Sequence, residues 1–240
     1  MSSNKTLSRR AFVKVARSAL RARRDPRLKG KRRHAIALYA LVLSRSLPER
    51  FARHFATVVI HKTYVFLYCA YAGRPFRGFM HDWSKFSPSE FLSSVKYYSG
   101  RNSPVGLERE IEGRSFAWLH HKGRNKHHFE YWQDVVDENG RFCTIPNAIY
   151  PLPMPFPFAL EMICDVIAAS RAYNGKRFHY DLLMKWWNNH CRRPVNMHPR
   201  TRRFAQEMYE QMQRDGNCSA LRRAREIYDR AQIDPDPEKD

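Results

Sequence analysis

Apolar residues recur at helical spacing along most of the chain, and no segment alternates well enough between apolar and polar positions to predict a strand. Ser87-Pro88-Ser89-Glu90 has the composition of a capping box, in which Ser87 caps a helix and Glu90 closes the box. Residues 137–157 contain Gly140 and several prolines, so they are expected to form an extended loop. The expected helices cover residues 47–72, 79–86, 88–98, 114–122, 127–136, 158–173, 178–190, 200–213 and 221–231. The pattern predicts an all-α protein.

The most apolar window, Phe55 to Gly73, has almost the length of a membrane span. It contains His61 and Lys62, and charged groups are costly inside a bilayer. We therefore expect a buried core helix here and no transmembrane span.

Basic residues are concentrated at the N-terminus. The chain has 240 residues and a formal charge of +20, and residues 1–33 contain 13 Lys or Arg against a single acid, Asp25. This composition predicts a disordered basic arm over residues 1–33, followed by a helical domain over 34–215 and a basic helix with an acidic tail over 216–240. Nucleic acid or another anionic surface is the candidate partner of the arm, and a solvated tail without a partner is the alternative.

The cysteine pattern bears on the compartment. The number of cysteines is odd and no two are close in sequence, so neither a disulfide framework nor a CxxC zinc site is expected. The simplest expectation is a reducing, cytoplasmic location. The Arg-rich, acid-poor N-terminus also fits a mitochondrial transit peptide, which would apply in a eukaryote.

Histidines and acidic residues interrupt apolar segments where the helical pattern calls for an apolar side chain. His61 lies in the most apolar helix, Asp165 interrupts another, and Glu161 shares the face of Asp165. A buried carboxylate is costly unless it is paired, and a metal cation would stabilise it. Each residue taken singly has an ordinary explanation, such as a hydrogen-bonded core histidine or an ion pair. Together with His81-Asp82 and the histidines at 120, 121, 127 and 128, they favour a metal site.

The order of these residues resembles the HD-domain superfamily of metal-dependent phosphohydrolases, which is all-helical and named for a His-Asp doublet. His127-His128-Phe129-Glu130 is also similar to a segment of its cyclic-dinucleotide phosphodiesterase branch. Over roughly residues 55–212 the chain resembles more closely an uncharacterised family of small bacterial and phage proteins. The segments that match its signature are His61-Lys62, His81 to Phe91, Ala117 to His121, Arg124 to His128, with Lys126 in place of the usual Pro, and Glu161 to Asp165.

The resemblance implies an HD-domain-like helical bundle that binds one or two divalent ions of manganese, iron, zinc or magnesium. His121 and His128 are closer in sequence than the corresponding superfamily ligands usually are, which favours one metal ion over two. His120 and His127 are alternates, because neighbouring residues of a helix point about 100° apart. The implied metal ligands are His61, His81, Asp82, His121, His128 and Asp165.

Several residues beside these ligands have expected roles in catalysis or substrate binding. Lys85 lies one turn beyond His81, where its ammonium would contact a substrate phosphate. Glu161 would orient a ligating histidine or act as a general base. Arg124 and Asn125 would bind an anionic substrate, although a solvated arginine and a helix cap explain them equally well.

The sequence leaves three functions open. The first is a metal-dependent hydrolase of a phosphoester, with phosphorylated small molecules and nucleotides as candidate substrates. The second is a di-iron oxygenase of the same superfamily, which uses a very similar ligand set. The third is a non-enzymatic protein that binds nucleic acid through residues 1–33 and holds a structural metal.

Overall fold

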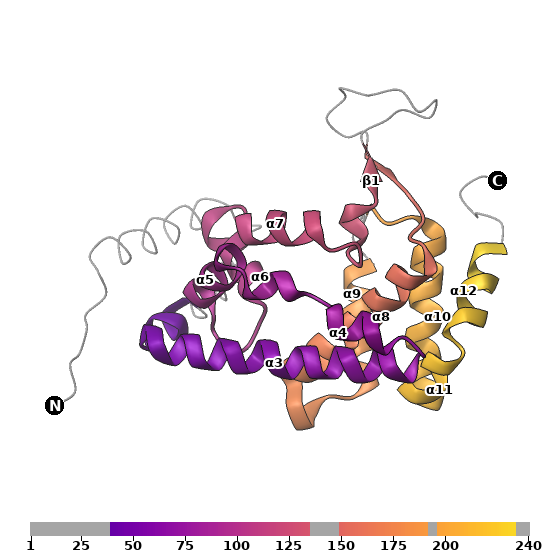
Figure 1. The fold of residues 1–240 in the computed structure, drawn as a ribbon, viewed down its shortest axis with the longest axis horizontal. Coiled ribbons are helices and arrows are strands. Elements are labelled where there is room, and N and C mark those ends of the chain that lie inside the picture. The colour runs from indigo at the N-terminus through magenta and orange to yellow at the C-terminus, as the bar shows by residue number, and fades with distance from the viewer. Residues whose placement is uncertain (1–38, 135–148, 192–195, 234–240) are drawn as a thin grey trace. The chain divides into compact units, whose positions relative to one another are not determined.

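The computed structural model describes residues 39–134, 149–191 and 196–233, and most of these residues are helical (Figure 1). The prediction of an all-α protein is confirmed. The predicted basic arm over residues 1–33 and the acidic tail over residues 234–240 lie outside the described residues. Among the described helices, none combines the length and the apolar character that crossing a bilayer requires.

The chain divides into two compact units, and each unit contains two separate stretches of sequence. The first unit contains Met1–Ala56 and Ser84–His121, and the second contains Thr57–Trp83 and Lys122–Asp240. Two of the division points fall inside helices, within α3 (Leu47–Tyr71) and α7 (Phe116–Arg124). The domain limits expected from the sequence stay a prediction.

The first unit is built around α5 (Pro88–Tyr97) and α6 (Pro104–Glu112), which pack against each other. Both helices begin with a proline, whose fixed φ suits the first turn of a helix. Tyr39, Val42, Tyr97 and Leu107 form its small apolar core. The predicted capping box is wrong in one respect, because the Ser87 hydroxyl accepts no capping hydrogen bond from a backbone N–H and instead lies 3.1 Å from the Ser89 hydroxyl.

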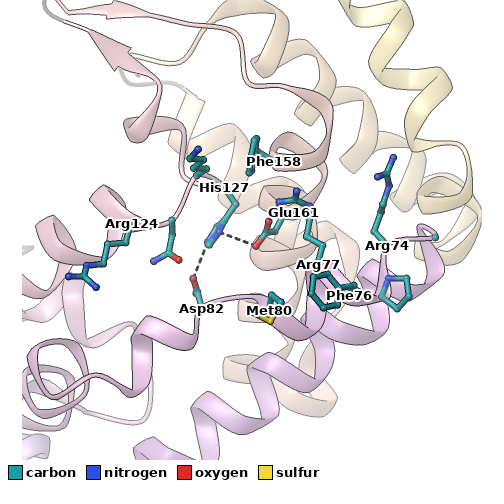
Figure 2. A pocket seen from close by; sticks show the side chains of 13 residues that line it. Arg74, Phe76, Arg77, Met80, Asp82, Arg124, His127, Phe158 and Glu161 are labelled. Carbon is teal, nitrogen blue, oxygen red and sulfur yellow. Dashed lines mark hydrogen bonds and ion pairs between the residues drawn. The ribbon is translucent and has the colours of Figure 1, made fainter.

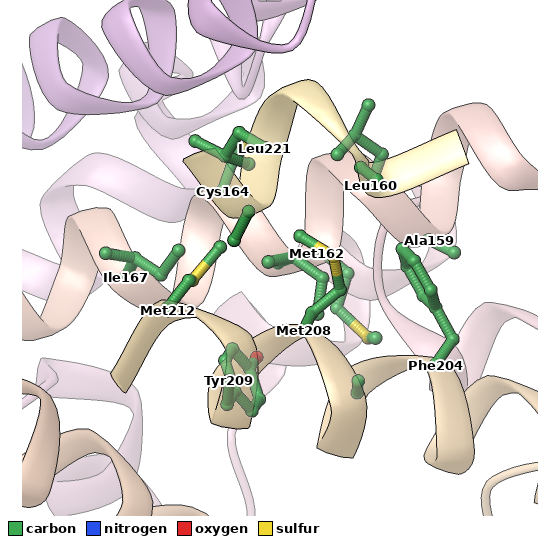
Figure 3. Packing of buried hydrophobic residues seen from close by; sticks show 14 of the residues in the cluster. Ala159, Leu160, Met162, Cys164, Ile167, Phe204, Met208, Tyr209, Met212 and Leu221 are labelled. Atoms are coloured by element: carbon green, nitrogen blue, oxygen red, sulfur yellow. The ribbon is translucent and has the colours of Figure 1, made fainter. Parts of the chain in front are cut away.

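The second unit contains the main core, between α8 (Phe156–Asn174) and α10 (Pro199–Asp215) (Figure 3). Leu160 and Ile167 of α8 are buried in the same cluster as Met208 and Met212 of α10. The helices α11 (Asn217–Arg222) and α12 (Ala224–Ile233) also pack on α10. The second unit is completed by the 3-10 turn η4 (Gly175–Arg177) and the helix α9 (Tyr180–Cys191).

The helix expected over residues 127–136 is not formed. The chain instead has a turn at His127, a 3-10 turn η3 (Phe129–Tyr131) and a short strand β1 (Gln133–Asp134). β1 pairs antiparallel with β2 (Tyr150–Pro151), with Gln133 opposite Pro151. His128 has extended backbone angles, which end any helical turn before it can propagate.

The helix expected over residues 79–86 is divided in two. The helix α4 (Pro75–Met80) ends just before the doublet, and the 3-10 turn η2 (Trp83–Phe86) begins just after it. Asp82 has a φ of +50° between them, in the left-handed region that interrupts a right-handed helix. His81 and Asp82 therefore lie at a sharp turn of the backbone and not on a continuous helix face.

Candidate metal centre

The His81-Asp82 turn holds two polar side chains in the interior. His81 is 1% exposed and Asp82 is 2% exposed. Asp82 is the one residue other than glycine with a positive φ in the part of the chain that the structure describes. Positive φ is strained for a side chain with a Cβ atom, and such strain concentrates at functional sites. This backbone conformation thus points to a functional role for the doublet.

Close packing of α4 against α3 positions this turn. A Cβ atom on Gly78 would lie 2.8 Å from Cβ of Cys69 and 2.8 Å from Cα of Phe66. No side chain fits at that distance, so Gly78 allows the two backbones to approach. The backbone N–H of His81 then donates to the carbonyl of Gly78, which connects the doublet to the end of α4.

Lys62 provides a second support that the sequence analysis did not identify. Its ammonium donates a hydrogen bond to the carbonyl of His81 and lies 4.6 Å from the centroid of the Trp83 ring. A lysine directly after His61, inside an apolar helix, was the available signal. Lys62 thus contacts the residues on both sides of Asp82.

The structure brings together His61, His81, Asp82 and Asp165, as the sequence analysis expected. Each residue offers one ligand atom, and these atoms all lie within 4.8 Å of one another. Nε2 of His61 is 3.0 Å from Oδ1 of Asp165. Nε2 of His81 is 3.4 Å from the same oxygen and 3.1 Å from Oδ2 of Asp82. Residues from α3, the α4–η2 turn and α8 therefore form one cluster of imidazoles and carboxylates.

Glu161 orients two of the histidines. Its Oε1 is 2.9 Å from Nδ1 of His81 and 3.3 Å from Nδ1 of His127. Its Oε2 accepts a hydrogen bond of 2.9 Å from Arg77. An imidazole that donates from Nδ1 presents Nε2 as its ligand atom, and Nε2 of both histidines faces Asp82. This geometry fits the orienting role expected for Glu161.

The charges of the cluster compensate one another. Burial lowers the pKa of His81, but the carboxylates of Asp82, Asp165 and Glu161 outweigh burial and raise this pKa well above its ordinary value. Burial raises the pKa of Glu161, but the hydrogen bonds from His127 and His81 lower it below the ordinary range. Positive charge in this position therefore stabilises the ionised carboxylates, and a metal cation would supply the same charge.

The donor atoms fit a divalent metal ion. Nε2 of His81 is buried and makes no hydrogen bond of acceptable geometry, although carboxylate oxygens lie 3.1 and 3.4 Å away. Atoms that lie close together without bonding one another are arranged as ligands around a shared centre would be. Imidazole nitrogen with carboxylate oxygen is a common donor set for zinc, manganese and iron.

His127, which the sequence analysis treated as an alternate to His128, belongs to this cluster. Its Nε2 is 3.4 Å from Oδ1 of Asp82. His128 also offers a ligand atom within 4.8 Å of those of Asp82 and His127. On a helix, only one of two neighbouring histidines would face a given site. His127 and His128 lie in a turn, so both side chains can face Asp82.

The other residues that the sequence analysis assigned to the metal and phosphate site, His121 and Lys85, belong to the first unit. In this unit the Glu90 carboxylate contacts two histidines. Nδ1 of His120 is 2.6 Å from Oε1 of Glu90, and Nδ1 of His121 is 2.8 Å from Oε2. Burial, and after it the charge of Lys85, lowers the pKa of His54. The expected metal-binding role of His121 and phosphate-binding role of Lys85 stay predictions. Glu90, assigned to a helix cap from its sequence position, was missed as a partner of histidine.

A cationic pocket of about 540 Å³ adjoins the cluster in the second unit (Figure 2). Asp82, His127 and Glu161 line it, so three residues of the cluster are reached from the pocket. Arg124 and Asn125, the predicted substrate-binding residues, also line it. Further lining comes from Arg74, Arg77 and Lys126, which the sequence analysis had not assigned to a site.

Comparison with known proteins identifies a family without an assigned activity. No curated protein and no solved structure matches this chain, and the HD-domain resemblance stays a prediction. The chain matches the model of a family of unknown function, DUF5662, over residues 50–211. Because the match covers more than half of the chain, the protein belongs to the DUF5662 family.

Proposed function

We propose that this protein is a metal-dependent hydrolase of a phosphoester. One observation supports this proposal above others: a single pocket joins the imidazole and carboxylate cluster to arginine and lysine side chains. The cluster offers donors for a cation, and the guanidinium groups offer charge and hydrogen bonds to phosphate oxygens. A site that combines both is suited to a phosphorylated substrate.

Four residues would hold the metal ion, with Glu161 behind them. These are His61, His81, Asp82 and Asp165, and His127 is a further donor beside Asp82. A divalent metal ion at such a site acts as a Lewis acid and lowers the pKa of bound water to about 7.

The chain's own cations would bind and orient the phosphate. Arg77 donates to Glu161 at 2.9 Å and lies 4.6 Å from the centroid of the Phe158 ring. Both contacts restrict the guanidinium while it still lines the pocket. A restricted arginine loses less entropy when it binds a phosphate, which favours productive orientation of the substrate.

An oxygenase with two iron ions is the second candidate. Asp82 belongs to two overlapping groups of donors, one with His61, His81 and Asp165 and the other with His127 and His128. Two metal ions would share Asp82 in such an arrangement. The cationic lining of the pocket favours the hydrolase, because a phosphoester hydrolase always binds a phosphate and an oxygenase need not.

Metal analysis of the purified full chain, followed by assay, tests the proposal. His81→Ala and Asp82→Ala should each remove most of the bound metal and the hydrolysis of p-nitrophenyl phosphate or bis(p-nitrophenyl) phosphate. His179→Ala and Asp181→Ala are matched controls, because both side chains are exposed on the second unit. Full metal retention in both cluster variants would contradict the proposed site. Bound iron with oxygen-dependent turnover and no phosphate release would favour the oxygenase.

A further inference from the structure

A stripe of exposed apolar side chains runs along α4 into η2, beside the cationic pocket. Phe76 is 76% exposed, Phe79 55%, Met80 51% and Trp83 50%. Their spacing of three, four and seven residues places the helical members on one side of α4. These four residues, here called the apolar stripe, flank the buried His81-Asp82 doublet. Large exposed side chains grouped beside a polar site indicate a binding surface.

Two rings of the stripe are held in place by contacts within the unit. The rings of Phe79 and Trp83 meet edge to face with centroids 5.9 Å apart. Nε1 of Trp83 donates a 3.0 Å hydrogen bond to the carbonyl of Phe79, and the ammonium of Lys62 lies 4.6 Å from the Trp83 centroid. A half-exposed ring that is already ordered loses little conformational entropy when a flat ligand stacks on it.

The stripe continues into the pocket, and cations lie on both sides of the cluster. Phe76 and Met80 belong to the stripe and also line the pocket. Figure 2 shows Arg124 and Arg74 at opposite sides of the pocket, with the His127–Glu161 pair between them. A single phosphate monoester would occupy one of these positions. Two separated cations fit two phosphates of one longer chain.

We propose that the substrate is single-stranded nucleic acid, an inference that rests on the proposed function. Its phosphates would contact Arg74 and Arg124, and its unpaired bases would stack on the apolar stripe. Aromatic platforms beside a basic groove bind single strands because every base has a π face, whereas the bases of a duplex are already stacked. The proposed hydrolase would then act on a phosphodiester.

The phosphodiester reaction balances with water as the only co-reactant. The oxygen of water forms a bond to phosphorus, and the bond between phosphorus and the leaving sugar oxygen breaks. One proton of the water ends on the leaving oxygen, and the other atoms of the water stay with the new phosphate monoester. No oxidant or reductant takes part.

The experiment compares two single-stranded probes that differ only in their bases. One is a fluorescent oligothymidine of about 20 nucleotides, and the other has the same length but lacks bases. Affinities of the full chain as purified are measured by fluorescence anisotropy, and both probes carry phosphorothioate linkages, which resist cleavage. Charge-driven binding by residues 1–33 is common to both probes, so the ratio of their dissociation constants isolates stacking.

Wild type should bind the oligothymidine about tenfold or more tightly than the probe without bases. Phe76→Ala with Trp83→Ala should reduce this ratio to near one, while the variant keeps a cooperative thermal unfolding transition, because the two side chains are 76% and 50% exposed. Trp186→Ala is the matched control, because Trp186 is an exposed aromatic residue of α9. It should keep the wild-type ratio.

Three outcomes would overturn the inference: a wild-type ratio near one, a ratio that the double variant does not change, or variants that lose only binding to anionic phospholipid vesicles. The last outcome would make the stripe a membrane-docking surface.

The same measurements distinguish failure of this inference from failure of the proposed hydrolase function. Hydrolysis of bis(p-nitrophenyl) phosphate without a base-dependent ratio would leave the hydrolase proposal standing and reject the nucleic acid substrate. A base-dependent ratio without hydrolysis would support the binding surface alone.

Discussion

Glu161 accepts hydrogen bonds from the imidazoles of His81 and His127 through one oxygen and from Arg77 through the other. Its negative charge orients the two imidazoles and would make them better ligands for a metal ion. Glu161→Gln keeps the shape of the side chain but removes this charge. We expect metal affinity to fall by about 10- to 100-fold in this variant, measured by competition with a chelator.

Glu207→Gln provides the control for that variant. Glu207 pairs with Arg230 on the surface at 3.2 Å and lies on α10, away from the cluster residues in sequence. The metal affinity of the Glu207→Gln variant should equal that of the wild type. Equal affinities for wild type and Glu161→Gln would show that Glu161 does not support the ligands.

His54 makes stability depend on pH in the first unit. It packs between the rings of Phe91 and Tyr98, with centroids 4.9 and 5.1 Å away, and its Nδ1 is buried without a hydrogen bond. Burial first, and then the charge of Lys85, lowers the pKa of His54 to about 4. Unfolded His54 takes up a proton near pH 6.5 and folded His54 does not, so stability falls as the pH drops from about 6.5 toward 4.

Replacing His54 tests this pH dependence. His54 should account for about 2 kcal/mol of the loss in unfolding free energy between pH 7 and pH 5. His54→Leu should remove that part of the loss, as measured by urea unfolding at both pH values. His179→Leu, at an exposed site, should keep the wild-type dependence. Parallel losses in wild type and His54→Leu would exclude His54 as the cause.

The contact between α3 and α4 depends on a single glycine. A Cβ atom on Gly78 would collide with the backbone of Phe66 and with Cβ of Cys69, neither of which is the end of a flexible side chain. Gly78→Ala should therefore destabilise the protein by about 1–3 kcal/mol in urea unfolding and weaken metal binding by displacing His81-Asp82.

Gly106→Ala is the matched control for this substitution. Gly106 also lies in a helix, α6, and a Cβ atom there would meet nothing within 4 Å. Alanine is the better helix former, so stability should be unchanged or slightly higher. Similar losses of stability in Gly78→Ala and Gly106→Ala would show that the effect is general to helix glycines and does not come from the contact between α3 and α4.

Basic residues occur in two separate places in the full chain, at its N-terminus and at the pocket of the second unit. Residues 1–33 contain 13 of its 43 Lys and Arg residues, whereas the site in the second unit has its own arginines beside carboxylates. Deleting residues 1–33 should leave metal content and melting temperature unchanged. It should weaken binding to duplex DNA and flatten its salt dependence, because fewer counterions are released. An unchanged salt dependence would show that this segment does not bind the phosphates.

Local sequence patterns predicted most helices of the described chain, because helix periodicity and proline positions act over a few residues. The helices at 47–72, 88–98, 158–173 and 200–213 were predicted within three residues of α3, α5, α8 and α10. The proximity of His61, His81, Asp82 and Asp165 was also predicted, since a polar group in an apolar segment needs a partner. Their role as metal ligands stays a prediction.

Tertiary contacts decided which partner each polar group has. Glu90 bonds two histidines instead of capping its helix, and His127 joins the cluster because a turn replaces the expected helix. Arg74 and Arg77 come beside Phe158 and Glu161 of α8 only in the folded chain, where all four residues line the pocket. Side-chain direction and contacts between distant segments arise from packing, so no pattern within a few residues specifies them.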